Sequence, residues 1–151
     1  MPMLKFLLTR FMLMVSLMTT FYLLIRPFES HLIIPTVKMS SWMSGLIFER
    51  VYATNNNLII GDVRVEIVGA CTPTIFWALL LAYVVLDWRG KRSITTLMIG
   101  IPAIFLINTL RIPLIVILFN LGMSFQRAHE LAEYALFLPV MSLLVILNTK
   151  R

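Results

Sequence analysis

Charge and cysteine are both scarce in this sequence. Of its 151 residues only 13% are charged and one is a cysteine, whereas 60% are hydrophobic. Soluble domains have about 25% charged and about 45–50% apolar residues, so this composition excludes an ordinary soluble domain and a disordered chain. A single cysteine also excludes an intramolecular disulfide and a multi-cysteine metal site. The mean hydropathy of +0.92 predicts an integral membrane protein with a single membrane domain over residues 1–151.

Four apolar stretches predict the membrane-spanning helices of an all-α integral membrane protein. About 20 apolar residues are needed to cross a hydrocarbon core of ~30 Å. Arg26-Pro27 is expected to end the first span, and Thr72-Pro73 to start the second, with Thr as N-cap and Pro at the first helical position. The predicted spans cover residues 4–25, 74–88, 94–121 and 131–147.

Residues 27–70 are predicted to form an outer region with an interfacial amphipathic helix and a short β-hairpin. Asn55-Asn56-Asn57 is a turn signal, and the alternating segment 58–67 folds back on itself at Gly61-Asp62. The amphipathic helix is predicted from apolar residues at helical spacing. These residues are Met39, Trp42, Met43, Leu46, Ile47 and Val51.

The distribution of charge predicts the orientation. With four spans, the amino terminus, the loop at residues 87–92 and the carboxyl terminus lie on one side. That side has seven basic residues and Asp87, and so holds the whole net charge of +6. Because Lys and Arg are enriched in short cytoplasmic loops, we expect a multi-pass protein of the plasma (cytoplasmic) membrane with both termini inside. The basic residues separate apolar stretches rather than lining one surface, so nucleic acid is not expected as a partner.

Three chemically capable side chains are predicted at one depth, near the outer membrane surface. Cys71 precedes the second span and His129 precedes the fourth, each at the outer end. Arg111 follows Ile94 by 17 residues. At about 1.5 Å per residue, this places it roughly 26 Å from the cytoplasmic end of the third span. The topology therefore predicts that a thiol, a guanidinium and an imidazole lie together.

This set of groups suits nucleophilic catalysis by a cysteine. A helix start and a nearby cation both favour a thiolate. His129 can serve as base and then as acid toward a leaving amine, while Arg111 can bind a carboxylate or a developing oxyanion. As supporting residues, Asn108 is expected to fix Arg111 or donate a further hydrogen bond, and Glu133 to orient the imidazole. No metal or organic cofactor is implied.

Each of these residues also has a structural interpretation. A lone cysteine in a membrane protein is commonly a small apolar residue. Arg111 can belong to a structural ion pair or extend to the interface, and His129 can be an interfacial histidine. Glu133 can pair with Arg127 or lie solvated at the rim. The sequence alone leaves these alternatives open.

The ordered set of motifs resembles the exosortase/archaeosortase family over roughly residues 55–148. The segments that carry the resemblance are Val68-Gly69-Ala70-Cys71-Thr72, Asn108-Thr109-Leu110-Arg111-Ile112, and His129 before a final span. The extended run Gly61-Asp62-Val63-Arg64-Val65 before the cysteine is also similar. No single motif is specific, but their order and spacing are.

The resemblance implies a membrane-embedded cysteine peptidase or transpeptidase. Such enzymes cleave C-terminal sorting signals of exported proteins (a short motif, a transmembrane helix and a basic tail) at the outer membrane face, and transfer the new carboxyl end to an acceptor, often a lipid. On matching positions, Cys71 would be the nucleophile, Arg111 the catalytic arginine and His129 the third member. Thr72-Pro73 stands where family members often have Ser-Gly, and Glu133 where they often have a small residue.

Two other functions remain as alternatives. The first is a non-catalytic assembly or scaffold subunit that has the same fold and binds a partner transmembrane helix. The second, a small-molecule channel or transporter, has little support because the sequence shows no inverted repeat.

The topology predicts which positions are accessible from outside the cell. In a Cys71→Ala background, Asn56→Cys and Ser124→Cys should react with a membrane-impermeant thiol reagent in intact cells. Gly90→Cys should react only after permeabilisation, because residues 87–92 lie inside. Labelling of Gly90→Cys in intact cells would reverse the orientation and remove the outer-face site.

Overall fold

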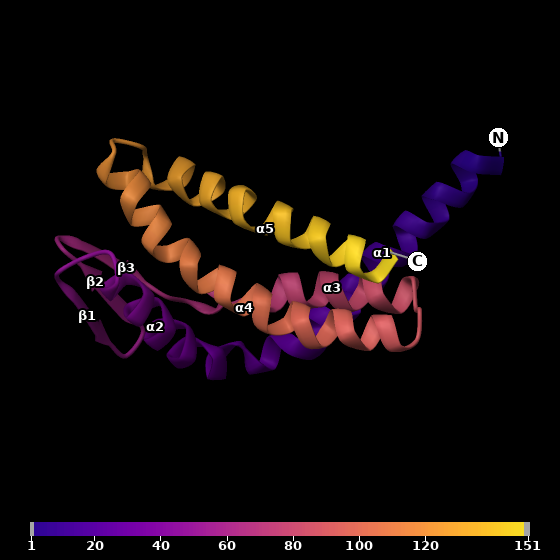
Figure 1. Cartoon of the computed structure of the whole chain (residues 1–151), viewed down its shortest axis with the longest axis horizontal. Helices are drawn as coiled ribbons and strands as arrows, with labels where there is room; N and C mark the ends of the chain where they lie inside the picture. Colours follow the sequence, from indigo (N-terminus) through magenta and orange to yellow (C-terminus); the bar gives the residue numbers. More distant parts are fainter. Residues whose placement is uncertain (1, 150–151) are drawn as a thin grey trace.

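The computed structural model describes residues 2–149 of the chain, which form five α-helices and a small antiparallel sheet (Figure 1). The helices are α1 (Pro2–Ile25), α2 (Glu29–Gly45), α3 (Thr74–Leu86), α4 (Lys91–Asn120) and α5 (Phe125–Thr149), with 3-10 turns η1 (Arg26–Phe28) and η2 (Gly69–Cys71). The strands are β1 (Val51–Thr54), β2 (Asn57–Ile60) and β3 (Val63–Glu66). The mostly helical fold predicted from the sequence is confirmed.

Three helical segments are long and apolar enough to cross a membrane, and a fourth is shorter. The long ones are Met3–Gly45, Lys91–Asn120 and Phe125–Thr149. The fourth, α3, has only 13 residues and ends at Leu86 rather than at Trp88. At about 1.5 Å per residue it extends ~20 Å, less than the ~30 Å of a hydrocarbon core. The helix of the second predicted span is therefore shorter than predicted.

The ends of the elements are arranged as the predicted topology requires. In Figure 1, α1 begins, α5 ends and α3 connects to α4 at one end of the molecule. The sheet and the connection from α4 to α5 lie at the opposite end. The three regions predicted to be cytoplasmic thus share one end of the fold.

The expected helix end at Arg26-Pro27 is only partly correct. The chain makes the single 3-10 turn η1 there and enters α2 directly, so the outer region begins with helix rather than loop. Proline fixes φ near −65° and needs no partner for a missing N–H, which makes it compatible with the first turn of a new helical segment.

Small polar residues of α2, rather than the predicted apolar stripe, face the rest of the protein. Its buried residues are Thr36, Val37, Ser40, Met43 and Ser44. Trp42 is 62% exposed, and Val51 lies in β1 rather than on the helix. Helix α2 ends at Gly45, so the predicted stripe is wrong at Leu46, Ile47 and Val51, which lie beyond the helix. The exposure of Trp42 agrees with an apolar face directed toward the membrane interface.

A hydrogen bond joins α2 to α4 next to a proline. Pro113 lies inside α4 and has no N–H to donate to the carbonyl of Thr109, four residues earlier. The Ser40 hydroxyl donates to this carbonyl at 3.3 Å. A neighbouring helix thus supplies the bond that proline removes, which is how prolines are tolerated in membrane helices.

The predicted hairpin is confirmed and a third strand extends it. Strand β2 pairs with β3 on one side and with β1 on the other, giving the order β1-β2-β3. Two-residue turns at Asn55-Asn56 and Gly61-Asp62 connect the strands, and Asn55 and Gly61 have φ of 52° and 59°. These positive angles suit the turns that match strand twist.

Two large apolar clusters hold the fold together, and a small third one joins α4 to α5. One joins the sheet to α2 and α4 through buried residues that include Leu58, Ile67 and Ile112. The other joins α3, α4 and α5: it contains Leu80, Val84, Ile104, Phe137 and Leu144. Helix α1 packs against α3, and its outward apolar side chains are largely exposed, as expected of a helix in contact with lipid.

Gly100 allows α4 to approach both α3 and α5, so its replacement should destabilise the protein. A Cβ at this position would lie 2.6 Å from Leu80 Cδ2 and 3.2 Å from Leu144 Cδ1. We expect Gly100→Val to cost about 1–3 kcal/mol through overpacking, measured as a lowered Tm of the detergent-solubilised protein. Gly45→Val is the matched control, because a Cβ at Gly45 meets nothing within 4 Å. Equal Tm values for the two variants would contradict this packing.

Candidate active site

Cys71 lies in the 3-10 turn η2, immediately before α3. Its N–H donates to the carbonyl of Val68 at 2.8 Å, and the N–H of Thr72 donates to the carbonyl of Gly69 at 3.0 Å. The Thr72 hydroxyl also donates to the Gly69 carbonyl, at 2.6 Å. Thr72 therefore closes the turn instead of capping the helix, and the prediction that it is the N-cap of α3 is wrong. Pro73 precedes the first helical residue.

Asn108 fixes the cysteine turn to α4. Its side-chain amide donates to the carbonyl of Cys71 at 2.7 Å, and the asparagine is fully buried. The sequence predicted a role next to Arg111, one helical turn away, but Asn108 bonds the backbone of the cysteine instead. A buried carbonyl outside regular secondary structure needs such a partner, because leaving it unpaired costs about 1–3 kcal/mol.

Glu29 supports the same turn from α2, a contact that the sequence analysis did not predict. The Thr74 hydroxyl donates to Glu29 Oε1 at 2.7 Å, and a Cβ at Gly69 would lie 2.9 Å from Glu29 Oε2. Glu29 and Thr74 are 45 residues apart, so no periodicity links them. The carboxylate also lies at the start of α3, where the helix dipole favours a negative charge.

Arg111, His129 and Glu133 form a charged group opposite the cysteine turn. Arg111 Nη1 lies 3.3 Å from Glu133 Oε2, and His129 Nδ1 lies 3.7 Å from the same oxygen. The Arg111 side chain is only 4% exposed, whereas those of His129 and Glu133 are 37% and 33% exposed. Glu133 thus pairs with Arg111, which the sequence did not predict, and lies beside His129, as expected from their spacing of four residues.

One nitrogen of Arg111 has no partner. Among residues 2–149, Nε of Arg111 is buried without a hydrogen bond. A buried donor in this state is uncommon, because its desolvation is not compensated. Arg111 therefore retains hydrogen-bonding capacity for a group that enters the site.

The thiol, guanidinium and imidazole lie around one cavity of about 350 Å³. It is lined by Cys71, Arg111 and His129 together with residues of β3 and its continuation, and with apolar residues of α4 and α5. The convergence predicted from membrane depth is thus present in the structure. His129 lies one turn inside α5 rather than before the last helix. Asn108 and Glu133 hold the groups on opposite sides of this cavity.

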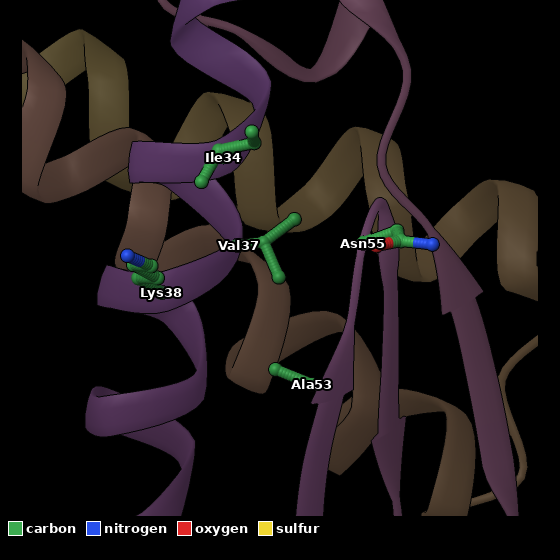
Figure 2. Close-up of a pocket in the computed structure, with 5 residues that line it drawn as sticks. All are labelled: Ile34, Val37, Lys38, Ala53 and Asn55. Carbon is green, nitrogen blue, oxygen red and sulfur yellow. The ribbon is translucent and has the colours of Figure 1, made fainter.

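Two other cavities lack this combination of groups. Figure 2 shows one of about 220 Å³ between α2 and the turn that follows β1, with Lys38 on α2 and Asn55 in the turn. The second, of about 230 Å³, has an apolar lining from α4, α5 and Ile47. Neither lining includes a nucleophile next to a base, so the cavity at Cys71 is the candidate active site.

The role of Asn108 can be tested by removing its amide. We expect Asn108→Leu to lower the free energy of unfolding by about 1–3 kcal/mol, because the Cys71 carbonyl loses its partner. Hydrogen–deuterium exchange of the detergent-solubilised protein should accelerate at residues 69–73. Thr109→Val is the matched control: this neighbouring buried hydroxyl bonds the Leu106 carbonyl of its own helix and Met43 Sδ of α2, but not the cysteine turn. Unchanged exchange at residues 69–73 in Asn108→Leu would exclude the proposed support.

Comparison with known proteins places the chain in a family. The family described as Transmembrane exosortase (Exosortase_EpsH) matches residues 1–146, a range that includes the sheet and all the residues around the cavity. No curated protein and no solved structure matches the chain. Since the family match extends over almost the whole sequence, the chain belongs to the transmembrane exosortases, a family of multi-pass membrane cysteine transpeptidases.

Proposed function

We propose that this protein is a cysteine peptidase or transpeptidase that processes C-terminal sorting signals of exported proteins at the outer membrane face. The observation that carries the proposal is the shared cavity of Cys71, Arg111 and His129. These residues come from η2, α4 and α5, which are distant in sequence. Membership of the exosortase family supports the same chemistry.

The depth of the site fits an enzyme that acts at the outer surface. Arg111 is 20 residues from the start of α4 at Lys91. At about 1.5 Å per residue this is ~30 Å, close to the thickness of the hydrocarbon core. With the Lys91 end in the cytoplasm, the cavity lies at the outer boundary of the membrane. A peptide bond just outside a substrate's transmembrane helix would reach it.

In the proposed first step, the sulfur of Cys71 attacks the carbonyl carbon of the scissile bond. The thiol proton passes to His129, whose Nδ1 faces Glu133 and whose Nε2 is therefore the atom that accepts it. A carbon–sulfur bond forms and the carbonyl electrons move to oxygen. When the carbon–nitrogen bond breaks, His129 returns the proton to the leaving amine, and a thioester remains on Cys71.

Arg111 stabilises the negative charge that develops in this step. Its buried guanidinium has an unpartnered Nε, and its side chain lines the cavity that holds the thiol. Donors fixed in advance around a developing oxyanion lower the barrier most where water is excluded. Glu133 compensates part of the arginine charge before substrate binds.

The second step releases the carboxyl end. An acceptor amine or hydroxyl, which a lipid headgroup can supply, attacks the thioester while His129 takes its proton. The sulfur–carbon bond breaks and the thiolate returns. With water as acceptor the same step is hydrolysis, so one site accounts for both peptidase and transpeptidase activity.

Substitutions at the three residues should abolish processing without preventing insertion. The assay follows shortening of a co-expressed exported protein that has a C-terminal motif, transmembrane helix and basic tail, by immunoblot. Cys71→Ala should reduce processing to background, and Cys71→Ser should lose most of it because a hydroxyl is far less ionised. Arg111→Lys should lose about tenfold or more, since lysine keeps the charge but not the planar set of donors. Arg127→Lys, on an exposed arginine near the cavity, is the matched control.

The three groups should also behave as a unit. His129→Ala should slow processing, but Cys71→Ala combined with His129→Ala should be no worse than Cys71→Ala alone. Full processing by Cys71→Ala at normal protein levels would contradict the enzymatic proposal. It would favour the helix-binding scaffold subunit instead.

A further inference from the structure

One edge of the sheet is unpaired beside the cavity. Among the described residues, β3 pairs only with β2, so its other edge has no strand partner. Native proteins usually cover or blunt such edges, because their free N–H and C=O groups bind other extended chains. Val65, Glu66 and Val68, from β3 and its continuation, line the same cavity as Cys71.

The hydrogen-bond register shows which backbone groups are free. Ile67 N–H donates to the carbonyl of Asn56 at 2.7 Å, and this pair continues the β2–β3 register, in which Asn57 faces Glu66. Bonded and non-bonded pairs alternate in an antiparallel ladder. The N–H and C=O groups of Arg64 and Glu66 therefore point away from β2, toward the open edge.

The cysteine lies on that open side. By the same alternation, the backbone groups of Val68 also point away from β2. The Val68 carbonyl accepts the N–H of Cys71 at 2.8 Å. Along this edge, the free backbone groups of Arg64 and Glu66 are therefore followed by the cysteine turn.

The charged side chains of β3 do not cover this edge. Arg64 Nε donates to Asn57 Oδ1 at 3.1 Å, and Glu66 Oε1 accepts from Asn56 Nδ2 at 3.0 Å. Both asparagines lie on the β2 side of the strand. The two residues best able to blunt the edge are therefore drawn away from it.

We propose that the free edge of β3 binds the substrate as an added β-strand, with the backbone N–H and C=O groups of Arg64 and Glu66 pairing with an extended peptide segment next to the scissile bond. This rests on the proposed function and specifies how its substrate is held. In strand addition, main-chain hydrogen bonds provide the affinity for the peptide, and pockets for its side chains provide the specificity. Here alternate side chains would enter a mainly apolar cavity that contains Arg111.

The test compares two reagents for Cys71 on the detergent-solubilised full chain. One is the small alkylating agent iodoacetamide, and the other is acetyl-Ala-Ala-Ala chloromethyl ketone, an extended peptide that forms a thioether and releases chloride. The rate of alkylation by the chloromethyl ketone divided by the rate with iodoacetamide, called here the rate ratio, measures peptide binding separately from thiol reactivity. This alkylation assay requires no catalytic turnover, so failure of the strand-addition proposal can be distinguished from failure of the proposed catalytic function.

Proline substitutions at the two edges of the sheet form a matched pair. Glu66→Pro removes an outward N–H of the edge that leads to Cys71 and keeps the backbone bonds to β2. Ala53→Pro does the same on the opposite edge, because Ala53 also faces outward in the β1–β2 register set by the Gly61 N–H to Arg50 carbonyl bond. Glu66→Ala is the control for the lost side-chain bond to Asn56, and it should leave the rate ratio unchanged. We expect Glu66→Pro to lower the rate ratio about tenfold, and Ala53→Pro to leave it unchanged.

A second measurement uses the unaltered protein and so does not depend on the folding of a variant. The same tripeptide reagent with methylated backbone nitrogens cannot donate hydrogen bonds, and its rate ratio should also fall about tenfold. Equal ratios for the methylated and unmethylated reagents would overturn the proposal. So would a Glu66→Pro variant that keeps the wild-type ratio but loses a dimer by size-exclusion chromatography, because the edge would then pair two copies of this chain.

Discussion

The hydrogen bond from Asn108 to the carbonyl of Cys71 is the contact on which the site depends. Chain outside a helix is tolerated at membrane depth only where protein satisfies its polar groups. Helix α3 is shorter than the thickness of a hydrocarbon core, and the turn at residues 69–71 lies just before it. Its carbonyls are bonded by Asn108 from α4 and by Thr72, while Glu29 from α2 supports the start of the helix. These contacts fix the turn that carries Cys71, which is partly exposed.

The same rule explains how α2 belongs to the structure. Its inward face is made of small residues, so its backbone can lie close to α4, and Ser40 donates to the Thr109 carbonyl that Pro113 leaves free. Small residues let helices approach each other closely in a membrane. This matters because transferring apolar side chains from lipid to the protein interior gives little favourable free energy. Pro113 of α4 is thus accommodated by a neighbouring helix, and α2 connects the sheet to the helix that carries Arg111.

The convergence of Cys71, Arg111 and His129 on one cavity could be predicted from the sequence, but side-chain partners could not. The order of the spans and the constant rise of a helix were enough to bring the three residues together. The spacing of His129 and Glu133 likewise showed their proximity. Three bonds join different elements, so residue spacing along the sequence cannot predict them. They are the bonds of Asn108 to Cys71, of Glu133 to Arg111 and of Glu29 to Thr74. The apolar spacing on α2 likewise could not show which residues pack inside the protein: in lipid, outward positions are apolar too, so hydrophobicity does not mark the buried face.

The pairing of Arg111 with Glu133 gives the site a defined electrostatic state before any substrate enters. A guanidinium that is 4% exposed needs an opposite charge, because an unpaired buried charge is strongly destabilising. A small residue at position 133, which the family resemblance would suggest, would leave it unpaired. Glu133 is one-third exposed and also lies beside His129, so it can turn toward water or the imidazole while the arginine stays fixed. In the proposed mechanism the developing oxyanion binds the unpartnered Nε of Arg111, and Glu133 is the partner of Nη1. The buried charge is then compensated before substrate enters, which gives a reason for a glutamate where a smaller residue would have left more room.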